Sequence, residues 1–144
     1  MSLGGRGGSP VQELRSAYQL DLNSGVWSKL PDMAQARNSH SCVLMGEDLY
    51  VIGGAPSYEN GKQIDNVEIL NISTLQWRAG PKLPRVLNTG QALVHKSTIY
   101  VVYQDGRVLK LNTAGRWEHV TNIGDIGSWE VNPAPVVSAG IMGC

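Results

Sequence analysis

The chain has 144 residues, with 12 basic and 12 acidic side chains and a formal net charge of zero at pH 7. Its lysines and arginines are scattered, so no basic surface of the kind that attracts nucleic acid is predicted. No apolar run reaches the roughly eighteen residues of a membrane span. We therefore expect neither nucleic acid nor a membrane as a partner, and we expect enough chain for one domain with its own core.

The N-terminal segment Met1–Pro10 is rich in glycine and has no apolar stretch of signal-peptide length, which favours a cytoplasmic location. The two cysteines, Cys42 and Cys144, are too few for a disulfide framework. We interpret Cys42 as a small buried side chain and Cys144 as a loose terminal thiol. Reduced cysteines are consistent with the same compartment.

Residues 1–30 have the pattern of the later part of a four-stranded unit. Leu3-Gly4-Gly5 ends one predicted strand, and residues 6–14 read as an exposed loop. Ala17–Leu22 alternates in polarity as a strand does, and Val26-Trp27 begins another strand after the turn at Ser24-Gly25.

Residues 32–77 contain a complete unit of four short apolar runs, each bounded by turn residues. Such runs, rich in β-branched and aromatic side chains, predict an antiparallel meander of strands, and none has the length of a typical helix. The four predicted strands are His40–Met45, Leu49–Ile52, Val67–Ile72 and Gln76–Arg78.

The unit recurs along the chain. Tyr50-Val51-Ile52 matches Tyr100-Val101-Val102 at an offset of 50, Trp27 and Trp77 are also 50 apart, and Trp117 follows 40 residues later. The shorter last spacing follows from Asp105-Gly106, a tight hairpin signal in place of the long polar loop Ala55–Asp65. A period of 40 to 50 residues with four strands per repeat favours the blades of a β-propeller.

One unit resembles a known repeat. A polar-His-Ser start at His40, the strand Leu49–Ile52 followed by Gly53-Gly54, and a tryptophan at Trp77 are similar to the kelch repeat. The resemblance implies an all-β fold of kelch-type β-propeller blades, each a four-stranded antiparallel meander, with about three blades' worth of chain and an incomplete ring.

The blade boundaries follow from the repeats. We predict a part-blade at 1–30, blades at 31–80 and 81–121, and a part-blade at 129–144, where Pro133–Ser138 resembles a first strand. Propellers typically close with four to eight blades, and an open stack exposes both end faces. Three situations remain open: a piece of a longer kelch protein, a natural truncated isoform, or a homo-oligomer that completes the propeller by self-association.

Several residues have predicted structural roles. Large flat side chains fill the wedge between neighbouring blades, so we assign the tryptophans to packing. The glycine doublet permits close backbone approach, and Tyr103-Gln104 replaces it in the third unit. The residues assigned to structure are Trp27, Trp77, Trp117, Tyr50, Tyr100, Gly53 and Gly54.

Loops at one rim are the predicted binding surface, as in kelch propellers that present rim loops to protein partners. Arg37 either clamps backbone carbonyls or reads a carboxylate of a partner, and Tyr58 is the predicted anchor on the long loop. His40 is interpreted as structural, with ligand contact as the alternative. The predicted partner-binding residues are Arg37, Asn38, Ser39, Tyr58, Glu59, Asn60 and Tyr103.

Catalytic and metal-binding motifs were not found. The three histidines and two cysteines lack the spacing of a metal site, and neither a phosphate loop nor a Gly-x-Ser-x-Gly motif occurs. We therefore expect no metal, no cofactor and no enzymatic activity. The resemblance implies a protein-interaction module, either a substrate adaptor of a ubiquitin ligase or an actin-binding protein. The alternatives are a self-assembling structural fragment and a sugar-active enzyme such as a mutarotase or oxidase.

Overall fold

The computed structural model describes residues 1–9, 12–56, 62–87 and 90–123, and these residues form β-strands joined by turns. Within these ranges no helix is long and apolar enough to cross a membrane. The predicted part-blade at 129–144 lies outside the described residues.

The middle sheet is a complete antiparallel meander in the order β6-β7-β8-β9. Its strands are β6 (Ser41–Met45), β7 (Asp48–Ile52), β8 (Val67–Asn71) and β9 (Gln76–Ala79). The register pairs Val43 with Tyr50 and Tyr50 with Ile69, so these three side chains share one face. Gly46, with φ of 62°, supplies the left-handed conformation that the tight turn between β6 and β7 needs.

The last sheet repeats this topology in the order β10-β11-β12-β13. Its strands are β10 (Gln91–His95), β11 (Thr98–Val102), β12 (Arg107–Leu111) and β13 (Trp117–Asn122). The pairing of β12 with β13 shifts between Val108 and Leu109, which indicates a β-bulge. The short turn between β11 and β12 occupies the place of the long loop in the middle sheet.

The first sheet has three described strands, in the order β1-β4-β5: β1 (Ser2–Leu3), β4 (Ala17–Leu20) and β5 (Trp27–Leu30). Between β1 and β4 the chain forms a separate hairpin of β2 (Arg6–Gly7) and β3 (Gln12–Glu13), where the sequence predicted an exposed loop without strands. Leu3 pairs with Ala17 as Ile52 pairs with Val67, so β1 corresponds to the end of β7.

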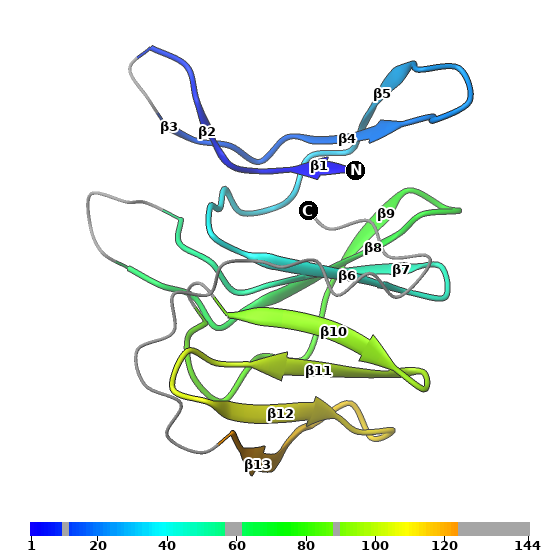
Figure 1. The fold of residues 1–144 in the computed structure, drawn as a ribbon. Coiled ribbons are helices and arrows are strands. Elements are labelled where there is room, and N and C mark those ends of the chain that lie inside the picture. The colour runs from blue at the N-terminus through cyan, green and yellow to red at the C-terminus, as the bar shows by residue number, and fades with distance from the viewer. Residues whose placement is uncertain (10–11, 57–61, 88–89, 124–144) are drawn as a thin grey trace.

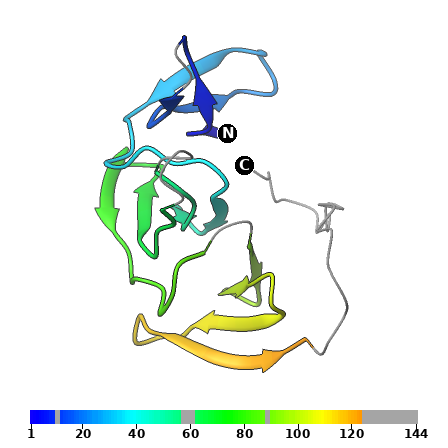
Figure 2. The same ribbon diagram turned by 90° about the vertical axis from the view of Figure 1, so that its left-hand side faces the viewer.

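The three sheets follow one another along an arc that does not close into a ring (Figures 1 and 2). This arrangement of antiparallel sheets, two of them four-stranded and one with three described strands, confirms the predicted all-β propeller fold with an incomplete ring. Two apolar clusters fill the two joints of the arc. The joint between the first and middle sheets buries Leu3, Ala17, Leu30, Met33, Cys42, Leu49, Val51 and Leu70.

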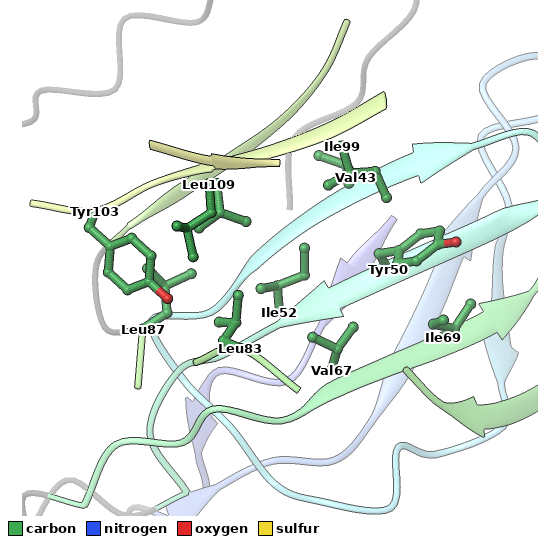
Figure 3. Close-up of a cluster of buried hydrophobic side chains, with 11 residues drawn as sticks. Val43, Tyr50, Ile52, Val67, Ile69, Leu83, Leu87, Ile99, Tyr103 and Leu109 are labelled. Carbon is green, nitrogen blue, oxygen red and sulfur yellow. The ribbon is translucent and has the colours of Figure 1, made fainter. Parts of the chain in front are cut away.

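The joint between the middle and last sheets is drawn in Figure 3. Side chains of β6, β7 and β8 face those of β11 and β12, with Leu83 and Leu87 contributed by the connection between the sheets. The buried residues are Val43, Tyr50, Ile52, Val67, Ile69, Leu83, Leu87, Ile99, Val101, Tyr103 and Leu109. Only the middle sheet is therefore covered on both faces by described neighbours.

A tryptophan forms the same hydrogen bond across each of the two joints. The indole N–H of Trp77 donates to the carbonyl of Pro31 at 2.8 Å, and that of Trp117 donates to the carbonyl of Pro81 at 2.8 Å. Each tryptophan therefore reaches back to the residue that follows the preceding sheet. Trp27 differs because it is 53% exposed, so its packing role stays a prediction.

The turn between β10 and β11 offers a test of local strain. Lys96 and Ser97 both have positive φ, 46° and 56°, in a two-residue hairpin that favours glycine or asparagine. Ser97→Gly should raise the free energy of unfolding by about 1 kcal/mol, because glycine adopts this conformation without strain. Urea denaturation measures the change. As a matched control, Ser73→Gly lies in an exposed turn without a positive φ and should not stabilise; equal effects of both variants would contradict this explanation.

Candidate functional site

The described parts of four segments meet at one rim of the arc: residues 53–56 and 62–66 between β7 and β8, the turn between β11 and β12, and the connections 31–40 and 80–87. Backbone contacts join them directly. Gly54 donates its N–H to the carbonyl of Leu87 at 2.7 Å, and Asn38 exchanges two hydrogen bonds with Ala55 at 2.9 Å each. Tyr103 donates its hydroxyl to the carbonyl of Arg85 at 3.2 Å. The rim is therefore one connected surface that includes both complete sheets.

A buried ion pair organises this rim. Arg37 is fully buried and pairs with Glu68 on β8, which is 6% exposed. The guanidinium also donates to the carbonyl of Gly53 at 2.8 Å and to the side-chain oxygen of Asn66 at 3.1 Å. Burial lowers the pKa of Arg37, and the charge of Glu68 opposes that effect; the guanidinium stays charged.

Glu68 also holds the connection that enters the middle sheet. Its carboxylate accepts hydrogen bonds from the backbone N–H of Ala34 at 2.7 Å and from that of Gln35 at 3.2 Å. The side chain of Asn66 adds a bond to the Gln35 side-chain oxygen at 2.8 Å. A segment with no strand pairing of its own is thus fixed by side chains of β8 and the residue before it.

The predicted role of Arg37 as a partner-binding residue needs correction. A side chain with no exposed area has no surface to offer a partner, and Arg37 instead clamps the carbonyl of Gly53, which was the alternative interpretation. Sequence periodicity carries a signal for this role. The offset of 50 places Leu87 where Arg37 stands, and strand register places Leu109 where Glu68 stands. Both leucines are buried in the second joint, so an apolar pair replaces the ion pair there.

The glycine doublet has a geometric role at this rim. Gly53 and Gly54 have φ of 67° and 96°. A Cβ on Gly53 would lie 2.6 Å from the carbonyl oxygen of Leu87, and one on Gly54 would lie 2.6 Å from that of Asn38. Both positions therefore require glycine, as the sequence predicted for them.

His40 lies beside this clamp with both ring nitrogens buried and without a hydrogen-bond partner. Desolvation and, second, the positive charge of Arg37 lower the pKa of His40 to about 4. The imidazole is therefore neutral at pH 7.

The exposed part of the rim is built around Arg85. Its guanidinium lies 5.0 Å from the centre of the Tyr103 ring and forms an ion pair with Asp105 at 2.7 Å. Desolvation, the largest contribution, raises the pKa of Asp105, but hydrogen bonds from the Arg107 N–H and the Arg85 side chain and the charges of both arginines outweigh it, so that pKa is lowered. Burial raises the pKa of Tyr103 to about 12.

Tyr103 is 5% exposed, so its predicted role as a solvent-facing binding residue is wrong. It belongs to the apolar cluster of the second joint, and the guanidinium of Arg85 lies over its ring. Arg85 was missed by sequence reasoning, although the offset of 50 places it opposite Gln35 in the same rim connection. A cavity of about 250 Å³ opens beside it, lined by Gln63, Arg85, Val86, Tyr103, Gln104 and Asp105.

The other predicted binding residues differ in exposure. Ser39 is exposed, with φ of 51°. Asn38 is only 8% exposed, so its predicted role in partner binding needs the same correction as that of Arg37. Tyr58, Glu59 and Asn60 lie outside the described residues. Among the described residues no group of three His, Cys, Asp or Glu side chains is arranged to hold a metal ion. Cys42 is buried but is not a free cysteine, so its interpretation as a reduced thiol is wrong.

Comparison with known proteins agrees with this architecture. The kelch motif family model matches residues 36–84. Beta-scruin of Limulus polyphemus is 32% identical over 64% of this chain and 10% of its own length. Kelch-like protein 35 of Mus musculus is 27% identical over 93% of this chain and 22% of its own length. The chain is therefore similar to kelch-repeat proteins, with the motif itself matched over residues 36–84, and it spans a quarter or less of the length of these two relatives.

A solved structure shares the fold. The structure of YjhT matches with a TM-score of 0.66 and 16% identity, over 83% of this chain and 51% of that chain. At this identity the similarity shows the fold alone. It also corrects one expectation: a kelch propeller fold shared this broadly does not separate interaction modules from enzymes, so the exclusion of enzymatic activity does not hold.

The buried imidazole of His40 predicts a specific pH dependence. Its pKa of about 4 in the folded state lies below the ordinary 6.5, so the unfolded chain binds the proton first. The contribution of neutral His40 to the free energy of unfolding should be fully present above pH 6.5. It should fall by about 3 kcal/mol as the pH drops to about 4. Denaturation between these pH values should show that His40→Gln removes this slope. The exposed His95→Gln is the control, and a slope retained in His40→Gln would contradict the assignment.

The repeat suggests a direct test of the ion pair. Arg37→Leu should lower the free energy of unfolding by about 3–5 kcal/mol, because Glu68 remains buried without its charge partner. Arg37→Leu with Glu68→Leu copies Leu87 and Leu109 of the next sheet and should cost less than Arg37→Leu alone. Urea denaturation of both single variants and the double variant gives the coupling energy. Strictly additive losses would show that the two side chains do not act as a pair.

Proposed function

We propose that this chain is a protein-interaction module that binds a protein partner through the rim around Arg85. The single observation that carries the proposal is a fixed, exposed guanidinium at the edge of a small hollow. Arg85 and Val86 are both exposed and adjacent, which combines a charged donor with an apolar contact. Arginine and aromatic residues that are held in place contribute most to binding at protein interfaces.

The geometry supports this role because Arg85 is ordered before a partner arrives. The ion pair with Asp105 and the stacking on Tyr103 hold the guanidinium in one orientation, which lowers the entropy lost on binding. The cavity beside it holds about 250 Å³, the size of one or two side chains. The amides of Gln63 and Gln104 line the same hollow and can hydrogen-bond to a carboxylate or a backbone group of the partner.

The resemblance to kelch propellers suggests two partner classes. One is the substrate of a ubiquitin ligase for which the chain acts as adaptor, and the other is actin. Exposed Ser39 in the connection 31–40 is a further candidate contact, and Tyr58, Glu59 and Asn60 stay predictions as further contacts. A cytoplasmic location is part of the same proposal.

Substitution of Arg85 and Val86 tests the rim. Binding to filamentous actin by co-sedimentation, and quantitative capture of proteins from a cell extract, are compared for the native chain, Arg85→Ala and Val86→Asp. Both variants should lower the affinity for a true partner by roughly tenfold or more. Arg116→Ala is the matched control, since this exposed arginine lies in the turn between β12 and β13.

Thermal unfolding of each variant checks that the fold is retained. The proposal requires a protein that binds the native chain and Arg116→Ala but not Arg85→Ala or Val86→Asp. If no such protein is found, the proposed rim is not the binding surface.

A further inference from the structure

The two ends of the arc carry different faces, and the repeats show what each face is built to meet. Within each joint, the sheet that follows presents its tryptophan-bearing face, and the sheet that precedes presents its opposite face. Trp77 reaches back to Pro31 in the first joint and Trp117 reaches back to Pro81 in the second. Every joint therefore has a fixed polarity along the chain.

The outer face of the last sheet corresponds to a face that is buried in the middle sheet. The offset of 50 and the strand register match Leu93, Tyr100 and Val102 with Val43, Tyr50 and Ile52. Val43 is 1% exposed and Ile52 is fully buried, whereas Leu93 is 41% exposed and Tyr100 and Val102 are partly exposed. We call this surface the Leu93 face; it consists of Leu93, Tyr100, Val102, Val108 and Lys110.

The outer face of the first sheet is of the opposite kind. Trp27 and Leu20 correspond to Trp77 and Leu70, and Leu70 is fully buried against the preceding sheet. In the first sheet Trp27 is 53% exposed and Tyr18 is 38% exposed. We call this surface the Trp27 face; it consists of Tyr18, Leu20, Trp27 and Lys29.

The two faces are complementary, but the described residues of one chain do not bring them together. In both internal joints a tryptophan-bearing face packs on a face that corresponds to the Leu93 face. The first and last sheets, which carry the two unpaired faces, lie at opposite ends of the arc (Figure 2). A second copy carries both surfaces in the order required. The chain also covers 51% of the length of YjhT, whose fold it shares, so two copies supply about the chain length of that propeller.

We propose that two copies of this chain close one propeller ring, with the Trp27 face of each packed on the Leu93 face of the other. The assembly has two-fold symmetry and two identical new joints, each heterologous in its surfaces, and it closes after two chains. Each new joint removes apolar surface from water as the two internal joints do. The inference is independent of the partner-binding rim, which the ring would display twice.

Light scattering on the 144-residue chain tests the assembly. The expected result is one species of about twice 15.6 kDa that dissociates on dilution. A monomer at all concentrations up to about 100 µM, well above the Kd of specific dimers, would overturn the proposal. A ladder of larger species would also overturn it, because it would show head-to-tail contacts that do not close.

Substitutions on the two faces identify the joint. Trp27→Glu and Leu93→Glu should each weaken the dimer at least ~10-fold, because each places a charge in both joints. Leu75→Glu is the matched control, since Leu75 is 44% exposed but lies in the turn between β8 and β9. An unchanged dimer in either face variant, or a weakened dimer in the control, would contradict the assignment.

A mixing experiment tests the polarity separately. A mixture of Trp27→Glu and Leu93→Glu contains one native joint, formed by the Leu93 face of the first variant and the Trp27 face of the second. At a concentration where each variant alone is monomeric, the mixture should form a heterodimer. Failure to do so, with both variants folded by circular dichroism, would exclude head-to-tail pairing.

Discussion

The ion pair between Arg37 and Glu68 is the interaction on which the organisation of this chain depends. It connects three parts that are distant in sequence: the segment that enters the middle sheet, the glycine doublet after β7, and the strand β8. Without Glu68, the backbone amides of Ala34 and Gln35 would lose their acceptors, and without Arg37 the carboxylate would lose its charge partner. Arg37 thus acts by holding the rim together and not by contacting a partner.

In the second joint, apolar side chains stand at the positions that the ion pair occupies in the first joint. Leu87 and Leu109 occupy the positions of the ion pair, and Tyr103-Gln104 stand where the middle sheet has its glycine doublet. Replacement of a buried ion pair by packed hydrophobic residues is often neutral or stabilising, so the two joints need not differ in strength. At the rim of this second joint the guanidinium of Arg85 is exposed and contacts Tyr103 and Asp105.

The sequence predicted what is local and periodic. Alternation placed Tyr50 in its strand, and the spacing of tryptophans identified the joints that Trp77 and Trp117 pin. What it could not predict depends on neighbours in space. Trp27 has the same spacing but a different environment, and Tyr103 is covered by an arginine 18 residues earlier in the chain. The burial of Arg37 depends on Glu68, a single charge within the otherwise apolar strand β8, whose direction toward Arg37 no spacing rule states.

Amide hydrogen exchange of Ala34 and Gln35, resolved residue by residue, tests the central role of the ion pair most directly. These amides lie outside any strand, yet both donate to the carboxylate of Glu68. We expect protection close to that of amides in β7, and loss of that protection in Glu68→Leu, which removes the acceptor, while β7 stays protected. Exchange at the rate of exposed loop amides in the native chain would show that Arg37 and Glu68 do not hold the connection.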